Sequence, residues 1–304
     1  MRMMKAEALE QSRVEAFLNF CRKHRDELDD SYLIDEELAG FRLSPDQPTY
    51  IVANSSGQIT AAASLILNDY SRRGRKARFR ILHADTADVK VYQDLLEAIL
   101  PHAAGMDKLN LFIPAVNTAA MEVLAAVRFA VERYTYVLVR EEPHIPEVSL
   151  PAGYELIPFR AGLDEAVWCE VRNAGFAKLQ GNETPATPAM VKQMISGADY
   201  IEGGLQILYH NGKAVGIVRG CADEYGDEPA MSIGPLAVLP EAQGRGLGRI
   251  LLRAALWFAG EQSYARTILC VNAENERAQA LYIGEGFKQA EALACLAYTV
   301  SEEG

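Results

Sequence analysis

The sequence predicts an α/β (α+β) protein made of two similar lobes, and three observations lead to this prediction. The chain has 304 residues, about the length of two average domains. In each half, segments with the two-residue period of strands alternate with segments of helical period. Between the halves, residues 141–153 contain three prolines and no periodic apolar pattern, which is typical of a linker. We therefore expect domains at residues 1–145 and 146–304.

The first half opens with a helix, because Val14, Phe17 and Cys21 lie on one helical face. Strands are expected where β-branched and aromatic residues alternate or run together, and the polar segment Asn54–Gly57 separates the first two as a turn. The predicted helices are Leu9–Cys21, Val91–Leu100 and Asn117–Val127. The predicted strands are Thr49–Ala53, Ile59–Leu67, Ala77–His83, Leu109–Ile113 and Phe129–Val139.

The second half repeats this order of elements. Thr187 and Pro188 are a favourable N-cap and first-turn pair, so they mark the start of a helix. Asn211 and Gly212 are a strong turn signal between two strands. The predicted helices are Leu163–Phe176, Thr187–Met194, Leu247–Ala259 and Glu276–Glu285. The predicted strands are Tyr154–Phe159, Leu205–Tyr209, Ala214–Cys221, Met231–Val238, Thr267–Val271 and Ala292–Val300.

Two pairs of landmarks relate the halves to each other. The turn residues Gly57 and Gly212 are 155 positions apart, and Asn117 and Asn275, each at the start of a late helix, are 158 apart. One offset with a three-residue adjustment therefore aligns both pairs. This favours two related lobes over one large fold.

The net charge of −11 is distributed unevenly, with −3 over residues 1–145 and −8 over residues 146–304. An acidic second half repels a phosphate backbone, which argues against binding to nucleic acid and suits a neutral or cationic partner. No apolar run is long enough for a membrane span, and residues 1–11 lack the apolar core of a signal peptide. We therefore expect a cytoplasmic protein with no membrane partner, and we leave its oligomeric state open.

The cysteines and histidines predict neither a disulfide framework nor a metal site. The five cysteines are odd in number and form no C-x-x-C motif, and most lie in apolar segments, as expected of reduced, buried thiols. The five histidines are scattered, and none has a metal-binding partner at the usual spacing along the chain. We therefore expect no metal cofactor.

A glycine-rich segment joins a predicted strand to a predicted helix in the second half, where residues 243–248 read QGRGLG. Glycines let a backbone approach a ligand closely, and the free amides and dipole of a helix start attract an anion. Arg245 and Arg249 add positive charge. No Lys-Ser/Thr pair follows, which argues against a nucleoside triphosphatase. The alternative is a glycine-rich turn that binds nothing.

A second motif follows about 30 residues later. Residues 269–287 read LCVNAENERAQALYIGEGF, so that Asn275 is followed by Ala278 at +3, Tyr282 at +7 and Gly286 at +11. With both motifs, residues 205–298 resemble the GNAT superfamily of N-acetyltransferases, whose pattern is a strand, Q/R-x-x-G-x-G/A and then N-x-x-A-x-x-L-Y-x-x-x-G-F. The two-lobe layout, with the motifs in the second lobe, resembles tandem GNAT enzymes of the mycothiol synthase type.

The resemblance implies that each lobe has a mixed, mostly antiparallel central sheet flanked by helices. It also implies that the second lobe uses acetyl-CoA as co-substrate, with the diphosphate on the glycine-rich loop and the pantetheine arm beside the preceding strand. The positions carried over for acetyl-CoA are Leu236, Ala237, Val238, Gln243, Gly244, Arg245, Gly246, Leu247, Gly248, Arg249, Asn275 and Ala278.

The chemistry that the resemblance implies is direct attack of an amine on the thioester, with coenzyme A leaving as a thiolate. A phenol, with a pKa of about 10, can donate a proton or hydrogen bond to that sulfur, and the motif places Tyr282 there. An alkylammonium has a pKa of about 10.4, so the acceptor needs a base. Glu224 joins Tyr282 in the predicted catalytic set, without a firm ranking among its acidic neighbours. The other candidate bases are Asp223, Asp227, Glu228 and Glu274.

The first lobe lacks the groups that this chemistry needs. Shifting by 158 positions puts Leu124 where the second lobe has Tyr282. The counterpart of the glycine-rich loop, residues 85–90, has no glycine and contains Asp85 and Asp88, which oppose a diphosphate. We therefore expect residues 1–145 to be a degenerate lobe, and we leave open whether it contacts the acceptor.

The predicted function is transfer of an acetyl group from acetyl-CoA to a primary amine of a small molecule or peptide, within a ternary complex. The alternative is a non-catalytic sensor or interaction module that binds coenzyme A. A sensor has no need of a proton donor such as Tyr282. The sequence does not identify the acceptor.

Overall fold

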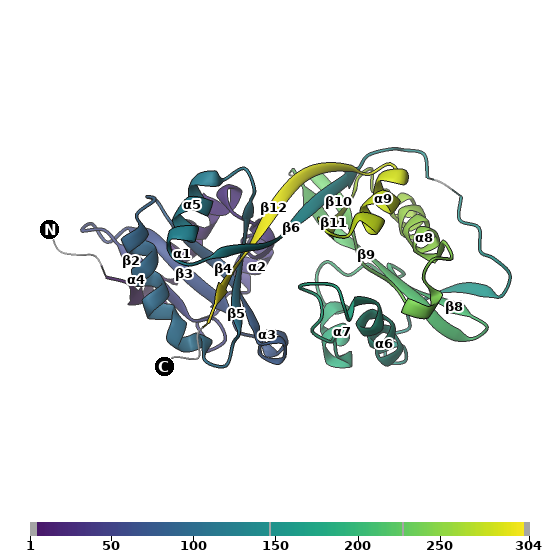
Figure 1. Cartoon of the computed structure of the whole chain (residues 1–304), viewed down its shortest axis with the longest axis horizontal. Helices are drawn as coiled ribbons and strands as arrows, with labels where there is room; N and C mark the ends of the chain where they lie inside the picture. Colours follow the sequence, from purple (N-terminus) through teal and green to yellow (C-terminus); the bar gives the residue numbers. More distant parts are fainter. Residues whose placement is uncertain (1–4, 146, 227, 301–304) are drawn as a thin grey trace. The chain divides into compact units, whose positions relative to one another are not determined.

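The computed structural model describes residues 5–145, 147–226 and 228–300. They form two compact units, one made of residues 5–135 with 292–300 and the other of residues 136–291 (Figure 1). The expected boundaries, 1–145 and 146–304, therefore need correction at both ends of the second domain. Residues 136–145 belong to the second unit, in which β6 lies beside β11, and 292–300 belong to the first, in which residues 293–299 pair with β5.

The sheet of the first unit has the strand order β1-β2-β3-β4-β5-β12. Its neighbours are antiparallel except for β4 and β5, which are parallel. The strands are β1 (Glu7–Ala8), β2 (Thr49–Ala53), β3 (Ile59–Ile66), β4 (Lys76–Ala84), β5 (Lys108–Pro114) and β12 (Lys288–Thr299). This mixed, mostly antiparallel sheet confirms the predicted fold class.

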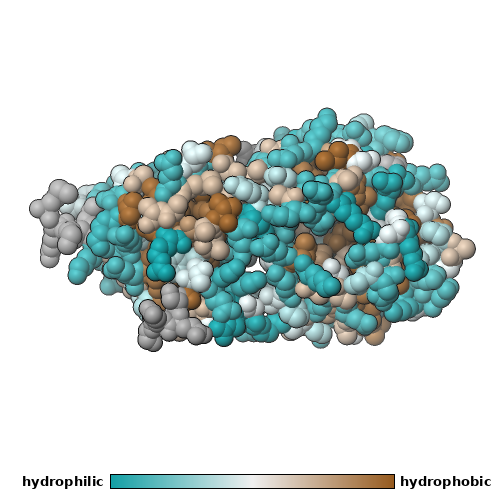
Figure 2. All heavy atoms as spheres, viewed as in Figure 1, coloured by the Kyte–Doolittle hydropathy of each residue, from teal (hydrophilic) through white to brown (hydrophobic). Residues whose placement is uncertain are grey.

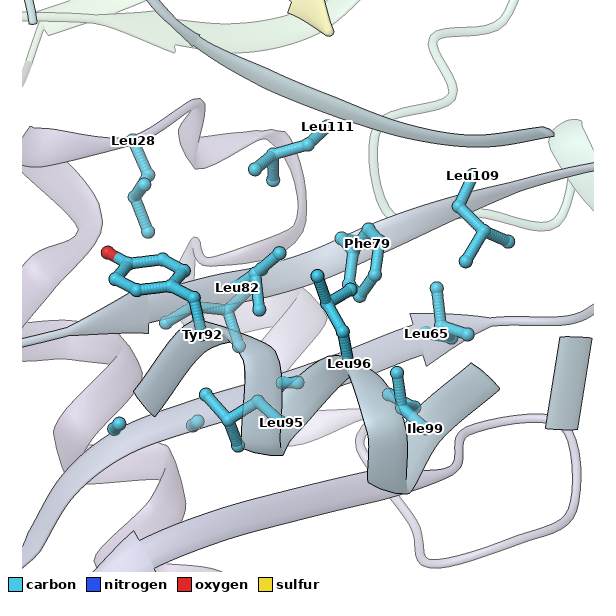
Figure 3. Close-up of a cluster of buried hydrophobic side chains, with 14 of the residues drawn as sticks. Leu28, Leu65, Phe79, Leu82, Tyr92, Leu95, Leu96, Ile99, Leu109 and Leu111 are labelled. Atoms are coloured by element: carbon cyan, nitrogen blue, oxygen red, sulfur yellow. The ribbon is translucent and has the colours of Figure 1, made fainter. Parts of the chain in front are cut away.

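Helices cover the first sheet, and α1 and α4 both pack on its β3 strand. Figure 3 shows the apolar side chains of α4, among them Leu95, Leu96 and Ile99, beside Phe79 and Leu82 of β4. The helices are α1 (Val14–His24), α2 (Asp35–Ala39), α3 (Asp69–Gly74), α4 (Val89–Ile99) and α5 (Thr118–Ala126). The helices α2 and α3 were not predicted, because each is too short for a helical period to show.

The second unit has the strand order β6-β11-β10-β9-β8-β7, with β10 and β11 parallel and β7, β8, β9 and β10 antiparallel in turn. The strands are β6 (Ala130–Arg140), β7 (Tyr154–Pro158), β8 (Leu205–His210), β9 (Lys213–Tyr225), β10 (Glu228–Val238) and β11 (Thr267–Asn272). At the hairpin between β8 and β9, Asn211 and Gly212 have φ of 49° and 79°, as the predicted tight turn requires.

Helices lie on both faces of the second sheet. A Cβ atom on Gly175 of α6 would lie 2.9 Å from Ala237, whereas one on Gly216 would lie 2.8 Å from Leu251 of α8. Ala237 pairs with Ile217, so these two side chains lie on the same face of the sheet. Gly216 precedes Ile217 on β9 and therefore faces the other side. Helices α6 and α8 thus cover opposite faces. The helices are α6 (Glu165–Phe176), α7 (Pro188–Met194), α8 (Leu247–Glu261) and α9 (Glu276–Gly284).

Each unit contains strand residues from the other half of the sequence. In the first unit, Leu293–Thr299 of β12 pair with β5, and in the second unit the strand beside β11 is β6. The strand pattern of residues 129–139 and 292–300 predicts the strands but not their partners.

Most surface residues in the view of Figure 2 are hydrophilic. None of the helices in the described part of the chain combines the length and apolarity needed to span a membrane. All five cysteines are free, and four of them are buried, in line with the prediction of buried thiols.

Candidate active site

The parallel strands β10 and β11 pair over a short stretch and then diverge. Two residue pairs join them, the second between Ser232 and Ile268, and no later pair is formed among the described residues. On its other side β10 stays paired with β9 as far as Val238, after a register shift. The edge of β10 beyond Ser232 therefore has no strand partner, and its backbone polar groups need a partner of another kind.

Residues 236–238, which we predict to lie along the pantetheine arm, form the end of β10 beyond this divergence. Ala237 and Val238 are buried and Leu236 is half-buried. These side chains pack against the apolar core of the second unit. We therefore expect their backbone, rather than their side chains, to pair with an elongated ligand that carries amides.

The glycine-rich loop follows the strand directly. Gly244 and Gly246 have φ of 80° and 78°, in the left-handed region that favours glycine. A Cβ atom on either residue would meet nothing within 4 Å, so the space above them is open. The side chain of Gln243 donates a hydrogen bond of 3.1 Å to the carbonyl of Val238 and ties the loop to the end of β10.

The start of α8 presents unpartnered amides. No side chain caps this helix, and among the described residues the amides of residues 244–248 donate to no backbone carbonyl. The first amide to do so is that of Arg249, which reaches the carbonyl of Gly246 at 3.1 Å. Free amides at the positive end of a 15-residue helix form an anion site. The loop therefore fits the diphosphate of coenzyme A.

The two arginines at the loop have different surroundings. Arg245 is exposed and donates to the carbonyl of Glu241 at 3.3 Å. The Nε of Arg249 lies 3.0 Å from the carboxylate of Glu285, which also accepts two hydrogen bonds, of 2.8 and 3.0 Å, from Arg253. The side chain of Glu285 is only 2% exposed and offsets part of the charge of Arg249. Glu285 was not predicted as part of the site, because no local pattern in the sequence distinguishes it from a surface acid.

Asn275 is the N-cap of α9. Its side-chain oxygen accepts from the amide of Ala278 at 3.2 Å, and Asn117 accepts from Ala120 at the same distance as the N-cap of α5. Capping therefore accounts for an asparagine at this position in both units. A contact between the side-chain amide of Asn275 and the cofactor stays a prediction.

Tyr282 lies on α9, with its ring centroid 6.1 Å from that of Phe287. Its neighbour Leu281 reaches α8, because a Cβ atom on Gly248 would lie 3.4 Å from Leu281 Cδ2. Burial raises the pKa of Tyr282 to about 12, so its hydroxyl keeps its proton over the physiological range. Tyr282 is therefore suited to donate a hydrogen bond and unsuited to act as a base.

All of the candidate bases among the described residues are open to solvent, Asp223 included. Glu224, near the end of β9, is exposed, and so are Glu228 at the start of β10 and Glu274 before α9. Asp227 lies outside the described residues. Solvent-exposed carboxylates need no catalytic role to explain them.

Asp223 has a more specific environment. Although Asp223 is exposed, partial burial of its carboxyl raises the pKa, and hydrogen bonds from the amide of Glu224 and the hydroxyl of Ser232 lower it in part. Ser232 is the last residue of β10 that pairs with β11. Asp223 therefore lies beside the point where the two strands diverge.

The matching positions of the first unit carry different groups. Leu124 is buried in the apolar core in the position of the tyrosine. The start of α4 is capped by Asp88, whose carboxylate accepts from the amide of Lys90 at 2.9 Å. The side-chain amide of Asn117 donates to the carbonyl of Glu27 at 3.1 Å. The start of α8 in the second unit is thus open, whereas the start of α4 in the first unit is occupied by the carboxylate of Asp88.

Diverging parallel strands that lead into an uncapped helix start, on a mixed and mostly antiparallel sheet, form a site that suits a ligand with an amide-bearing arm and a diphosphate. Residues 179–287 match the model of the Acetyltransferase (GNAT) family.

The chain is also similar to proteins named as mycothiol acetyltransferases. It is 31% identical over 212 residues to a mycothiol acetyltransferase of Pseudarthrobacter chlorophenolicus. The aligned region covers 64% of this chain and 61% of that protein. The match therefore spans less than two thirds of that relative.

Two solved structures share the fold over the full length. One is a GCN5-related N-acetyltransferase from Sphaerobacter thermophilus, with a TM-score of 0.70, 17% identity and coverage of 99% of this chain and 96% of that one. The other is a tandem GNAT protein from the clavulanic acid biosynthesis pathway, with a TM-score of 0.71, 14% identity and coverage of 99% and 100%. At these identities the likeness shows the fold alone.

Proposed function

We propose that this protein transfers the acetyl group of acetyl-CoA to a primary amine of a small molecule or peptide, and that the second unit performs the reaction. The observation that carries the proposal is the direct connection of two features. The unpaired edge of β10 beyond Ser232 leads straight into a loop whose amides, from residue 244 to residue 248, have no backbone partner among the described residues. One ligand with an amide-bearing arm and a diphosphate suits both features.

The residues of the chain have distinct roles in this proposal. Bound acetyl-CoA supplies an activated thioester, whose C–S bond breaks as the amine forms a new C–N bond. The amides of residues 244–248 hold the diphosphate, and the edge of β10 holds the arm. Tyr282 donates a hydrogen bond to the leaving sulfur. Because its pKa of about 12 exceeds the roughly 8.5 of a thiol, hydrogen bonding is favoured over full proton transfer.

The first unit is proposed to bind no acetyl-CoA, since Asp88 caps the helix start at the matching position. The alternative function for the whole chain, a sensor that binds coenzyme A without catalysis, would need the same loop but no acceptor. The names of the relatives favour the catalytic proposal.

Thiol release separates the two functions. The full chain is incubated with acetyl-CoA and a panel of polyamines, aminoglycosides, amino acids and the acceptor of mycothiol acetyltransferases, and free coenzyme A is measured with a thiol reagent. We expect thiol release that depends on both acetyl-CoA and one class of amine. Tight binding of acetyl-CoA by calorimetry, with no amine accepted from the panel, would support the sensor instead.

The carboxylate that accepts the proton of the ammonium can be tested by a matched pair of variants. We propose Asp223 ahead of its neighbour Glu224, because Asp223 is beside the divergence of the strands and its pKa is raised. Asp223→Asn is expected to lower kcat/KM by about 10²-fold, the size typical of acid–base catalysis, and Glu224→Gln to lower it little. The reverse result would restore Glu224 as the base.

The pH profile gives a second readout for Asp223. A raised pKa keeps the carboxyl protonated, and inactive as a base, to a higher pH than usual. As the pH is lowered, kcat/KM should therefore begin to decline at a pH above the pKa of an ordinary carboxylate. This decline should be absent from Asp223→Asn. An identical decline in the variant would show that another group titrates.

A further inference from the structure

The first unit contains a cluster of metal-ligating side chains that the sequence analysis did not predict. His24 is the last residue of α1, Glu27 follows in a 3-10 turn, and His83 lies near the end of β4. One ligand atom from each of the three lies within 4.8 Å of the others. His24 and Glu27 are three residues apart, whereas His83 is brought in by the fold. All three belong to the first unit, so the cluster is independent of the proposed active site.

The distances within the cluster are close to those of a metal site. The Nδ1 of His24 lies 3.0 Å from one oxygen of Glu27, and the Nε2 of His83 lies 3.5 Å from the other. The ligands of a tetrahedral zinc ion, with bonds of 2.0–2.1 Å, are about 3.4 Å apart. The two imidazole rings are also adjacent, with centroids 4.3 Å apart. Small side-chain rotations would therefore bring the three donors around one ion.

The two histidines are buried and incompletely partnered. His24 and His83 are 4% and 6% exposed. Within the described part of the chain the Nε2 of His83 has no hydrogen-bond partner, although a buried polar atom nearly always has one.

A second carboxylate lies behind His24. The Nε2 of His24 is 2.9 Å from Asp85, close enough for an ion pair but at an angle outside that of a hydrogen bond. Asp85 also pairs with Lys23 at 2.8 Å. Metal-bound histidines usually present their other nitrogen to a carboxylate in this way, which orients the ring. With Nδ1 toward Glu27 and Nε2 toward Asp85, His24 has both nitrogens placed for such a site.

The surrounding core holds the donors in place. Leu28, next to Glu27, and Leu82, next to His83, both belong to the buried cluster of the first unit (Figure 3). The hydroxyl of Tyr92 accepts from the amide of Ala84 at 3.3 Å, which fixes the end of β4. The side chain of Glu27 is 52% exposed, and this leaves a path from solvent and room for a water ligand.

We propose that His24, Glu27 and His83 bind a divalent zinc-type metal ion, with Asp85 orienting His24 and water completing the shell. Two imidazoles and one carboxylate are a donor set that zinc prefers, whereas calcium and magnesium prefer oxygen donors alone. The ion would join the end of α1 to the end of β4. The proposal departs from the expectation of no metal cofactor, which considered only the spacing of ligands along the chain.

The test uses the full chain without an affinity tag, freed of metal by a chelator and then dialysed. Titration with Zn²⁺ is followed by calorimetry, and titration with Co²⁺ by its visible absorption, which reports tetrahedral coordination. We expect one ion per chain for the unmodified protein. His83→Ala and, separately, Glu27→Gln should weaken binding of Zn²⁺ by at least about 10-fold to 100-fold, the loss that even outer partners of a metal site cause.

The matched control is His102→Ala, which removes a histidine of the same unit whose Nε2 meets the hydroxyl of Tyr50 at 2.9 Å. It should bind Zn²⁺ as the unmodified chain does. Zn²⁺ should also raise the melting temperature of the unmodified protein and of this control, but not that of His83→Ala. Glu27 is on the surface, so Glu27→Gln keeps the test valid if His83→Ala fails to fold. No binding of Zn²⁺ by the unmodified chain, or equal binding by Glu27→Gln, would overturn the proposal.

Discussion

Gly246→Asp is expected to abolish the binding of acetyl-CoA, weakening it by at least about 100-fold. Gly246 is the N-cap of α8 and the space above it is open. An aspartate there would place a negative charge beside the diphosphate, and its carboxylate could accept from the free amides of the first turn, as Asp88 does at the start of α4. The variant would reproduce in the second unit the closed helix start of the first. Calorimetry with acetyl-CoA measures the effect.

The backbone strain of such a change needs a control, and the chain offers one in the same unit. Gly246 and Gly212 have φ of 78° and 79°, and a Cβ atom on either meets nothing within 4 Å. Gly246→Ala and Gly212→Ala should therefore lose similar stability, about 1–2 kcal/mol each. Only Gly246→Ala should also weaken the binding of acetyl-CoA. Equal affinities in the two alanine variants would show that the loop is not the diphosphate site.

Tyr282→Phe is expected to lower kcat by about 10²-fold while leaving the affinity for acetyl-CoA nearly unchanged. The change removes only the hydroxyl, so the packing against Phe287 is retained and the hydrogen bond to the leaving sulfur is lost. Single-turnover rates at saturating acceptor measure the chemical step, and calorimetry measures the affinity. An unchanged rate would remove Tyr282 from the mechanism.

The control for this variant is Tyr264→Phe, just beyond the carboxyl end of α8, at the opposite end of that helix from the loop. It should leave both quantities unchanged. The pH profile adds a further check. Because Tyr282 keeps its proton until about pH 12, its ionisation should cause no loss of kcat below about pH 11. A decline at lower pH that disappears in Tyr282→Phe would contradict this assignment.

Local patterns in the sequence were enough to predict most elements of both units. Strand β2 was predicted at Thr49–Ala53 and is found there, and the Asn211–Gly212 turn joins β8 and β9 as expected. The glycine-rich loop is also at the expected place, between β10 and α8. These features depend on interactions between residues close in sequence, such as caps, turns and the period of apolar side chains, so the sequence alone determines them.

Other features depend on which distant residues meet. The pattern of β12 is that of any strand, and only the three-dimensional structure shows that residues 293–299 pair with β5. Alternation along a strand determines which side chains face the core, but strands of similar pattern compete equally for the same neighbour. For this reason the expected boundary at residues 145 and 146 missed the exchange of residues 136–145 and 292–300.

The same distinction separates the two kinds of site. The loop at residues 243–248 is contiguous, so its glycines are enough to predict an anion site from the order of the residues. The cluster of His24, Glu27 and His83, and the pairing of Arg249 with Glu285, join residues that are far apart along the chain. The sequence by itself determined the contiguous loop and the elements around it, and it predicts that the loop binds an anion. Only the tertiary structure decided which distant residues form these clusters, because tertiary packing brings side chains from distant parts of the chain within a few ångströms of each other and buries them together.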